Sequence, residues 1–405
     1  MGEIVELNIE SPAHGGECIG RLGGKVVLVS GAIPGETVKA EIYKSKKTLA
    51  WAKTIEVLHP AGERIAHIWP LAEKEGIGGV ELGHVSLRGG LDWKRAVILD
   101  QTRRIGGGET AEALAGLGLE VKSGAETGLH QRIRVEFEVN EQGLASMYRA
   151  GSHELVPIDS MPLACEQINS LGLFGTNTWQ FTPGDRVRVV ASGSGETKVV
   201  VAGKAFDSDR QPASKTVHYP LTGYIFPNSP QQITLAAKAT DFWQTHKNAP
   251  NILFGEVMAA LGDDIGNTVE LFAGSGLFSV GLATRASRLE TFEGGTSATN
   301  SAKKNLTALG LNARVHQGRI GPKTLEGKRL DTVVLDPPRS GAGRKLVESI
   351  AATGANKVLH IACDIAALAR DASYYLAQGY KWRRIRAFDL FPYTSHVEQV
   401  ALFER

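Results

Sequence analysis

The chain has 405 residues, of which 42% are hydrophobic and 22% are charged, as in an ordinary globular protein. This length exceeds what one hydrophobic core usually supports, so we expect two or three domains. Because 45 basic residues are balanced by 43 acidic ones, the net charge excludes a strongly basic chain, and any nucleic-acid surface must be a local patch.

The cysteines Cys18, Cys165 and Cys363 are far apart in the sequence. Their spacing argues against a disulfide framework and against a zinc or iron–sulfur site built from cysteines. The first residues lack the basic and apolar regions of a signal peptide, and no apolar run is long enough to span a bilayer. We therefore expect a cytoplasmic protein.

Short strands separated by glycine-rich turns predict a small β-barrel over residues 1–58. One hairpin gathers Lys44, Lys46 and Lys47 beside Tyr43 and Trp51. Cations beside aromatic rings suit phosphate contact and base stacking. A solvated hairpin whose charges protect a strand edge has the same composition, so both interpretations stay open.

A mostly β region is expected over residues 59–222. Two hairpins are predicted there, formed by Arg132–Val139 with Gly143–Arg149 and by Arg186–Val190 with Lys198–Val201. Ahead of them, Leu91–Ile105 has helical spacing and ends at three consecutive glycines, which are a strong stop signal.

Over residues 223–405 the pattern changes to apolar strands that alternate with helices, beginning with a helix at roughly Thr234–His246. The expected strands are Thr268–Phe272, Arg288–Phe292, Asp331–Leu335, Lys357–Ile361 and Val397–Phe403. This alternation predicts a Rossmann-like α/β domain, in which a parallel sheet has helices on both faces.

The first of these strands leads into a turn with glycines at Gly274 and Gly276, where backbone can approach a ligand. Ser279 replaces the third glycine of a dinucleotide site, and Glu270 suits a cationic ligand such as a sulfonium better than a pyrophosphate. Glu293 ends the next strand, where a carboxylate can accept hydrogen bonds from ribose hydroxyls. These features favour an adenosine-bearing cofactor over the alternatives, a structural turn and a helix cap.

Three further features follow later strands. Asp336 and Arg339 flank two prolines that stiffen a loop after its strand. Cys363 ends a strand and precedes a helix, and a thiol near a helix N-terminus tends toward a lower pKa. Glu398 precedes the last strand and is a candidate general base. Taken singly, Cys363 is also compatible with a buried apolar role, and Glu398 with a surface position.

Taken together and in this order, the FAGSG segment from Phe272, the DPPRSG segment from Asp336, Cys363 and the HVE triplet ending at Glu398 resemble the S-adenosylmethionine-dependent RNA (uracil-5-)-methyltransferases. The resemblance covers nearly the whole chain. The N-terminal barrel is similar to the TRAM RNA-binding module, which is typical of the 23S rRNA branch, and Tyr148–His153 resembles the central domain of the family.

The resemblance implies that Cys363 is the nucleophile and Glu398 the base. It would place the helix Leu91–Ile105 with the catalytic domain. It assigns contacts with S-adenosyl-L-methionine to Gln232, Phe272, Glu293 and Asp336, beside Gly274 and Gly276 of the turn. The expected RNA contacts are Arg339, Lys44, Lys46, Lys47, Arg132 and Arg149.

The chemistry of such an enzyme accounts for these two groups. Uracil C5 is a poor nucleophile, and addition of a thiolate at C6 makes it enolate-like. A base must then remove the C5 proton before the thiol can be eliminated, so one cysteine and one carboxylate are required. The target base must leave its stack, which suits loops in folded RNA.

The chain departs from the family pattern where many relatives bind an iron–sulfur cluster. Ile77–Val80 and Met161 occupy the places of family cysteines, and Cys165 alone cannot hold a cluster. We therefore predict no iron–sulfur cluster and no metal.

Other departures lie at the cofactor and the nucleophile. Asp364 follows the cysteine, and a second carboxylate there would raise the pKa of the thiol. Arg319 stands where an acidic residue is expected near the adenine. The family run of two aromatics and a glutamine is matched to Ser229–Thr234, which keeps Gln232 but lacks the aromatics.

We expect a monomer that methylates uridine C5 in structured RNA, with 23S rRNA favoured and tRNA as the alternative substrate. A second hypothesis is a non-catalytic RNA-binding protein that keeps the methyltransferase fold. A third, methylation of an exocyclic amino group, would need an aromatic residue after the two prolines and no thiol. Arg339 and Cys363 argue against it.

Overall fold

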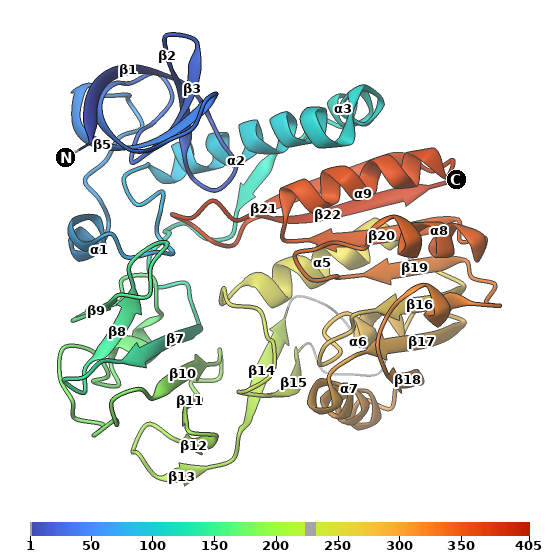
Figure 1. The fold of residues 1–405 in the computed structure, drawn as a ribbon. Helices are drawn as coiled ribbons and strands as arrows, with labels where there is room; N and C mark the ends of the chain where they lie inside the picture. Colours follow the sequence, from blue (N-terminus) through green and yellow to red (C-terminus); the bar gives the residue numbers. More distant parts are fainter. Residues whose placement is uncertain (1, 223–231) are drawn as a thin grey trace. The chain divides into compact units, whose positions relative to one another are not determined.

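The computed structural model describes residues 2–222 and 232–405. Within them, the strands form a closed barrel, a seven-stranded sheet, a two-stranded hairpin and an eight-stranded sheet (Figure 1). The chain divides into two compact units. Unit 1 comprises Met1–Gln101, Met147–Val156 and Phe391–His396, and unit 2 comprises Thr102–Ser146, Pro157–Leu390 and Val397–Arg405. The domain boundaries at residues 58 and 222 stay a prediction.

The closed barrel of unit 1 confirms the N-terminal expectation. Its strands follow the order β1-β2-β3-β5-β4, and β4 closes the barrel against β1. Leu7, Val27 and Val38 are buried inside it, whereas Asn8 faces outward, as alternation along a strand requires. The strands are β1 (Glu3–Pro12), β2 (Cys18–Leu22), β3 (Lys25–Ser30), β4 (Thr37–Ser45) and β5 (Leu49–His59).

Two helices complete unit 1, α1 (Pro70–Glu75) and α2 (Leu87–Gln101). The second confirms most of the helix expected over Leu91–Ile105. The remainder is a π-helical turn, Thr102–Gly106, that belongs to unit 2 and contacts α9 (Ile365–Ala377) there. The placement of the whole helix with the catalytic domain stays a prediction.

The middle of the chain forms the seven-stranded sheet, in the order β13-β12-β11-β10-β7-β8-β9. The pairs β7–β8 and β10–β11 are the two predicted hairpins. The strands are β7 (Arg134–Val139), β8 (Ala145–Tyr148), β9 (Leu155–Pro157), β10 (Arg186–Ala191), β11 (Thr197–Val201), β12 (Lys204–Phe206) and β13 (Pro212–Ala213), with α4 (Glu166–Asn169) beside them.

The helix expected over Thr234–His246 is wrong. This segment begins with β15 (Gln232–Lys238), which pairs with β14 (Thr216–Thr222). Alanine and lysine are good helix formers, but Ile233, Leu235 and Ala237 are buried at a period of two, and strand pairing overrides the local propensity. The helix of this region, α5 (Ala249–Leu261), begins only after Asn248.

The eight-stranded sheet of unit 2 has the order β18-β17-β16-β19-β20-β22-β21-β6. The five strands from β18 to β20 are parallel, whereas β22 lies antiparallel between β20 and β21. The expected sheet is thus mixed rather than wholly parallel. Its strands are β16 (Asn267–Leu271), β17 (Arg288–Glu293), β18 (Arg314–Gln317), β19 (Thr332–Leu335), β20 (Lys357–Ala362), β21 (Lys381–Asp389), β22 (Glu398–Glu404) and β6 (Val121–Ser123).

Helices cover both faces of this sheet, as expected (Figure 1). One layer contains α5, α6 (Ser279–Leu282) and α7 (Thr296–Ala308). The other contains α3 (Gly108–Ala115), α8 (Arg344–Ala352), α9 and the 3-10 turn Pro322–Leu325. The central strands are buried on both sides, which explains why their apolar runs are continuous. Among the described helices, none has the length and apolar character that a membrane span requires.

Candidate active site

Cys363 and Glu398 lie opposite each other at the end of the large sheet where the parallel strands have their carboxyl ends. They do so because β22 runs antiparallel to β20. Ala362, the last residue of β20, is paired with Gln399. Cys363 directly follows β20 and Glu398 is the first residue of β22, so the register brings the two predicted catalytic residues opposite each other. One antiparallel strand pair thus brings together two residues that are 35 positions apart in the sequence.

The thiol of Cys363 is partly exposed, and its pKa is raised to about 12. Burial is the largest cause, the carboxylates of Glu398 and Asp336 raise it further, and Arg339 lowers it. The lowered pKa expected from the helix N-terminus is therefore wrong, because desolvation and two carboxylates outweigh the helix. Asp364 caps α9, where its Oδ1 accepts a hydrogen bond from the Ala367 amide (2.7 Å).

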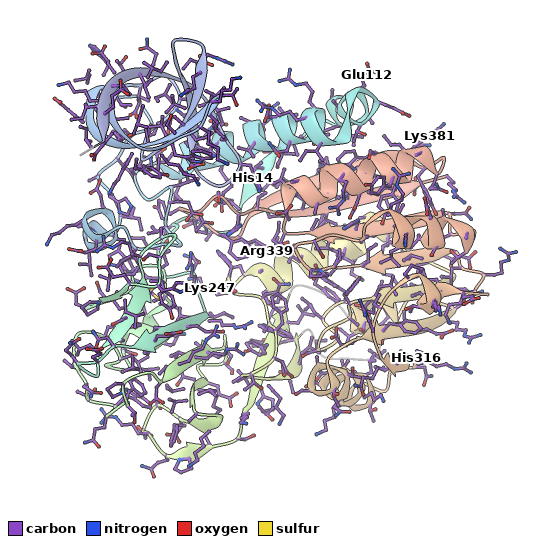
Figure 2. The ribbon with its side chains drawn as sticks, viewed as in Figure 1. His14, Glu112, Lys247, His316, Arg339 and Lys381 are labelled. Atoms are coloured by element: carbon purple, nitrogen blue, oxygen red, sulfur yellow. The ribbon has the colours of Figure 1, made fainter. Side chains whose placement is uncertain are left out.

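The carboxyl groups beside the thiol favour their protonated forms. Glu398 is 6% exposed, and burial, with a contribution from Asp336, raises its pKa well above the usual range. Burial also raises the pKa of Asp336 to about 7. Arg339, labelled in Figure 2, lies on the same loop as Asp336 and lowers the pKa of Glu398. The site therefore combines a partly exposed thiol, two carboxyl groups whose pKa values are raised by burial, and one exposed guanidinium.

The turn after β16 adopts the left-handed backbone that a tight ligand loop requires. Gly274 and Gly276 have φ of 56° and 90°, and Phe272 has φ of 64°, which is uncommon for a bulky residue. A Cβ added at Gly274 would meet nothing within 4 Å, whereas at Gly276 it would meet Ala302 of α7 at 3.2 Å. The turn is thus open on one side and closely packed on the other.

Two glutamates border this turn. Glu293 accepts hydrogen bonds from the amides of Gly274 (2.9 Å) and Gly295 (2.7 Å), which ties the end of β17 to the turn. Glu270 is 1% exposed, and its Oε2 accepts a hydrogen bond from Ser279 Oγ at 2.5 Å. Burial raises the pKa of Glu270 to about 8, and its Oε1 has no hydrogen-bond partner among the residues that the structure describes. An orphaned buried carboxyl oxygen is a feature that a cationic ligand would satisfy.

Asn305 of α7 is a residue of this region that the sequence did not single out. Its side chain is 4% exposed and exchanges hydrogen bonds with the backbone of Ala236 (2.8 and 3.0 Å). It also donates to the Ser275 carbonyl (2.9 Å), so it joins β15 to the glycine turn. In the sequence, the one indication of this role is that Asn305 is a polar residue at a position of the amphipathic helix α7 that faces the protein interior.

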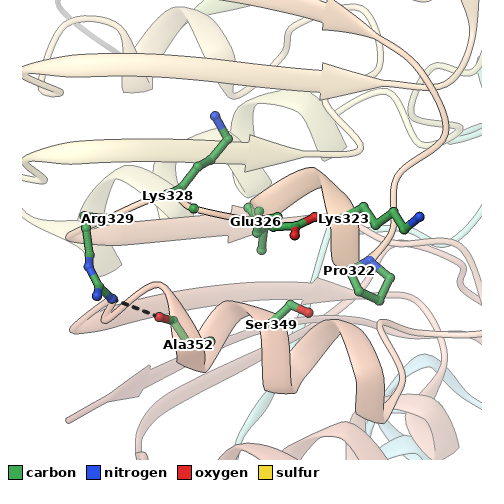
Figure 3. A pocket seen from close by; sticks show the side chains of 9 residues that line it. Pro322, Lys323, Glu326, Lys328, Arg329, Ser349 and Ala352 are labelled. Atoms are coloured by element: carbon green, nitrogen blue, oxygen red, sulfur yellow. Dashed lines mark hydrogen bonds between the residues drawn. The ribbon is translucent and has the colours of Figure 1, made fainter.

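A hollow of about 530 Å³ lies elsewhere on unit 2, between the 3-10 turn and α8 (Figure 3). Its lining includes Lys323, Glu326, Lys328, Arg329 and Ser349, and none of the predicted site residues. Lys328 is paired with Glu290, and Arg329 donates to the Ala352 carbonyl. Lys328 and Arg329 thus already have partners within the protein, and the candidate site stays with the predicted residues.

Comparison with known proteins agrees with this geometry. Residues 1–55 match the TRAM domain, and residues 312–405 match the tRNA (Uracil-5-)-methyltransferase model. The chain is 34% identical to an uncharacterized RNA methyltransferase of Bifidobacterium longum, over 99% of this chain and 96% of the relative. The chain belongs to the TRAM-containing RNA (uracil-5-)-methyltransferases. A second uncharacterized RNA methyltransferase, from Streptomyces coelicolor, is 32% identical over 100% of this chain and 93% of its own length.

Two further similarities concern proteins with assigned substrates. A 23S rRNA (uracil(1939)-C(5))-methyltransferase of Shewanella is 28% identical over 96% of this methyltransferase and 93% of its own length. The crystal structure of Pyrococcus abyssi tRNA (uracil-54, C5)-methyltransferase, solved with S-adenosyl-L-homocysteine, has a TM-score of 0.69 and 18% identity. It covers 98% of this chain and 100% of that one, so the fold is shared throughout.

The glutamine assigned to the cofactor has two candidates in this methyltransferase. Gln232 is exposed at the first residue of β15. Part of the run to which it was matched, residues 229–231, lies outside the described residues. Phe242-Trp243-Gln244 provides the two aromatics and the glutamine of the family run, and Gln244 is 7% exposed. Because this segment keeps both aromatics and lies shortly before α5, we propose Gln244 as the stronger candidate.

The residues expected to contact RNA differ in their exposure and in their contacts within the protein. Lys44 and Lys46 lie 4.6 and 5.7 Å from the ring of Trp51, and Lys47 is exposed. Arg149 instead is bound to Glu154 (2.8 Å), Glu75 (3.4 Å) and the Glu75 carbonyl. Arg132 is half-buried, and its backbone joins neighbouring segments. Arg149 and Arg132 thus have structural roles, and their contact with RNA stays a prediction.

The places of the family's cluster cysteines are apolar and buried. Ile77, Val80 and Met161 are 5%, 2% and 3% exposed, and burial raises the pKa of Cys165. The described residues contain no group of three or more His, Cys, Asp and Glu side chains suited to a metal ion. Arg319 is exposed after β18. The absence of an iron–sulfur cluster stays a prediction.

Proposed function

We propose that this enzyme methylates C5 of a uridine in structured RNA through a covalent bond between Cys363 and C6. The observation that supports it most directly is the pairing of β20 with β22, which sets a thiol opposite a buried carboxyl group. Neither residue alone performs this reaction, and the fold brings both to the sheet edge where ligands bind in α/β proteins.

In the proposed reaction the thiolate of Cys363 adds to C6. The electron pair of the C5–C6 double bond moves into an enolate, in which C5 is nucleophilic. S-adenosylmethionine supplies the methyl group that C5 attacks. Glu398 in its carboxylate form then removes the C5 proton, the double bond forms again and the thiolate leaves. Arg339 supplies positive charge beside both residues, where negative charge develops during the reaction.

The residues around the glycine turn fit this cofactor. Buried Glu270 has an oxygen without a hydrogen-bond partner among the described residues, and burial raises the pKa of Asp336, so a cationic ligand would stabilise the ionised forms of both carboxyl groups. A sulfonium held there would also favour the ionised forms of Cys363 and Glu398, which are the forms that the proposed reaction needs. Glu293 at the end of β17 is suited to the ribose hydroxyls.

Ribosomal RNA is the favoured substrate class. The 23S rRNA relative matches across 96% of the chain, including the barrel, whereas the tRNA-modifying neighbour at 18% identity supports the fold alone. The exposed hairpin with Lys44, Lys46 and Trp51 suits a structured polyanion with unpaired bases.

Methyl transfer from labelled S-adenosylmethionine to total RNA that lacks 5-methyluridine tests this function. We expect label in 5-methyluridine, carried by an RNA of the size of 23S rRNA. Label in a tRNA fraction would change the substrate class. Label in another nucleoside, or no label from a folded, cofactor-binding protein, would contradict the proposed function and favour a non-catalytic RNA-binding protein.

A further inference from the structure

A pair of adjacent residues on α9, Arg370 and Asp371, holds the loop that follows β19. Asp371 is fully buried. Its carboxylate accepts hydrogen bonds from the amides of Ala342 (2.6 Å) and Gly343 (3.1 Å). Arg370 donates to Asp371 (2.8 Å) and to the Ser340 carbonyl (2.7 Å). Residues 340–343 are therefore fixed to α9 by charge-assisted hydrogen bonds, which are among the stronger ones in proteins.

The backbone of this loop is shaped to fit against the pair. Gly341 has φ of 72°, and its amide donates to the Pro338 carbonyl (2.7 Å). A Cβ at Gly341 would overlap the carboxylate of Asp371 and the guanidinium of Arg370. Only glycine allows this approach, so the loop and the helix are in direct backbone-to-side-chain contact.

The helix that holds the loop also follows the nucleophile. Cys363 precedes α9 directly, and Asp364 caps the helix through the Ala367 amide. The same loop contains Asp336 and Arg339, which act electrostatically on Cys363. The helix α9 therefore begins beside the thiol and also holds the loop segment that directly follows Arg339.

We propose that Arg370 and Asp371 are positioning residues that fix Arg339 relative to Cys363, an inference that rests on the proposed function. In this proposal Asp371 acts through the loop, whose amides it binds, rather than on the reacting atoms. Its loss would let residues 339–343 move away from α9 while Asp336 stays held to the sheet by the bond between its amide and the Leu271 carbonyl (3.3 Å).

The test compares Asp371→Asn and Arg370→Lys with Arg339→Gln and the wild type. Asparagine presents only one acceptor oxygen to the two loop amides. Lysine keeps the positive charge beside Asp371 but cannot donate in the fork geometry of arginine, and it serves if Asp371→Asn does not fold. Tyr380→Phe is the matched control, because it removes a buried hydrogen bond to the Ala355 carbonyl (2.8 Å) away from the loop.

The first readout is the rate at which iodoacetamide alkylates Cys363 at pH 8.5, measured on the Cys363 peptide. Glu398, Asp336 and Arg339 are the charged groups that act on this thiol, and Arg339 favours the thiolate. We expect both pair variants and Arg339→Gln to slow alkylation several-fold, and we expect Tyr380→Phe to match the wild type. This readout needs no RNA and therefore tests the positioning even if the proposed function fails.

The second readout is methyl transfer. We expect the pair variants to lower kcat roughly tenfold or more, as displacement of a positioned group does, with cofactor affinity within about threefold because Asp336 and the glycine turn are retained. Alkylation and kcat at the level of Tyr380→Phe, together with a lowered Tm, would show that the pair only stabilises the fold and would overturn the inference.

Discussion

The catalytic edge of the large sheet and the basic hairpin of the barrel hold their functional groups in opposite ways. At the sheet edge, Glu398 is 6% exposed and the charges of neighbouring groups act strongly on one another. In the barrel hairpin, Tyr43 is 61% exposed, and the ammonium groups of Lys44 and Lys46 lie over the Trp51 ring.

This difference follows from what each region has to do. Covalent chemistry requires a few groups in fixed positions with shifted pKa values, which demands burial and strained backbone. Attraction of RNA requires positive charge that water and phosphate can reach, and several lysines share that task. Substitutions should therefore act in an all-or-none manner at the sheet edge and in a graded manner in the hairpin.

The largest expected effect is that of Cys363→Ala. Methyl transfer should fall by roughly a thousandfold or more, as removal of a nucleophile does, while cofactor and RNA affinity stay near wild type. Cys165→Ala is the matched control, because it removes a thiol that is 3% exposed and has no proposed role in the chemistry. Full activity of Cys363→Ala in single-turnover assays would show that Cys363 is not the nucleophile.

Replacement of Lys44, Lys46 and Lys47 by alanine should give a graded loss. RNA affinity should fall about tenfold at low salt, and the slope of log affinity against log salt should decrease by roughly one per lysine that contacts a phosphate. Saturating RNA should restore kcat. The control replaces the exposed Lys303, Lys304 and Lys345 by alanine, which removes the same positive charge elsewhere. An equal loss of RNA affinity in this control would show that the hairpin has no specific role in RNA binding.

A smaller effect distinguishes the two candidate glutamines. Gln244→Ala should weaken cofactor binding several-fold, as loss of one or two hydrogen bonds does, because Gln244 is buried. The same change at exposed Gln232 should leave the affinity within about twofold. Calorimetric titration with S-adenosyl-L-homocysteine measures both, and the reverse order of effects would restore Gln232 as the contact.

A further expected change concerns stability and its pH dependence rather than activity. Burial raises the folded-state pKa of Glu270 from 4.5 to about 8, so the folded protein binds this proton more tightly than the unfolded chain. Between those two pH values, stability falls as pH rises. Glu270→Gln cannot ionise and should unfold at higher urea concentration than wild type at pH 8, with little difference at pH 4.5. Equal midpoints at pH 8 would contradict this, and the exposed Glu348→Gln serves as control.

The sequence predicted those parts of the fold in which local pattern and burial agree. The barrel, both central hairpins and the strands that precede Gly274, Asp336 and Cys363 were found because their apolar runs are bounded by glycine, proline or a charged residue. It missed β18, β21 and β6, which are short, irregular or distant in sequence from their partners.

Other properties depend on three-dimensional neighbours and could not be predicted locally. Burial raises the pKa of Cys363, and charged residues from two other segments of the chain act on it as well. Arg149 was expected to be free for RNA, but carboxylates of Glu75 and Glu154 surround it. Asn305 and Asp371 form hydrogen bonds with backbone groups of segments that are distant in the sequence, so a local pattern could not predict them.

The covalent pathway is tested most directly by Glu398→Gln incubated with RNA and S-adenosylmethionine. This variant can complete addition and methyl transfer but cannot remove the C5 proton, so we predict a denaturation-resistant protein–RNA adduct that contains the methyl label. The adduct should be absent from the double variant that also lacks Cys363. Normal turnover by Glu398→Gln, or an adduct that persists without Cys363, would contradict the account.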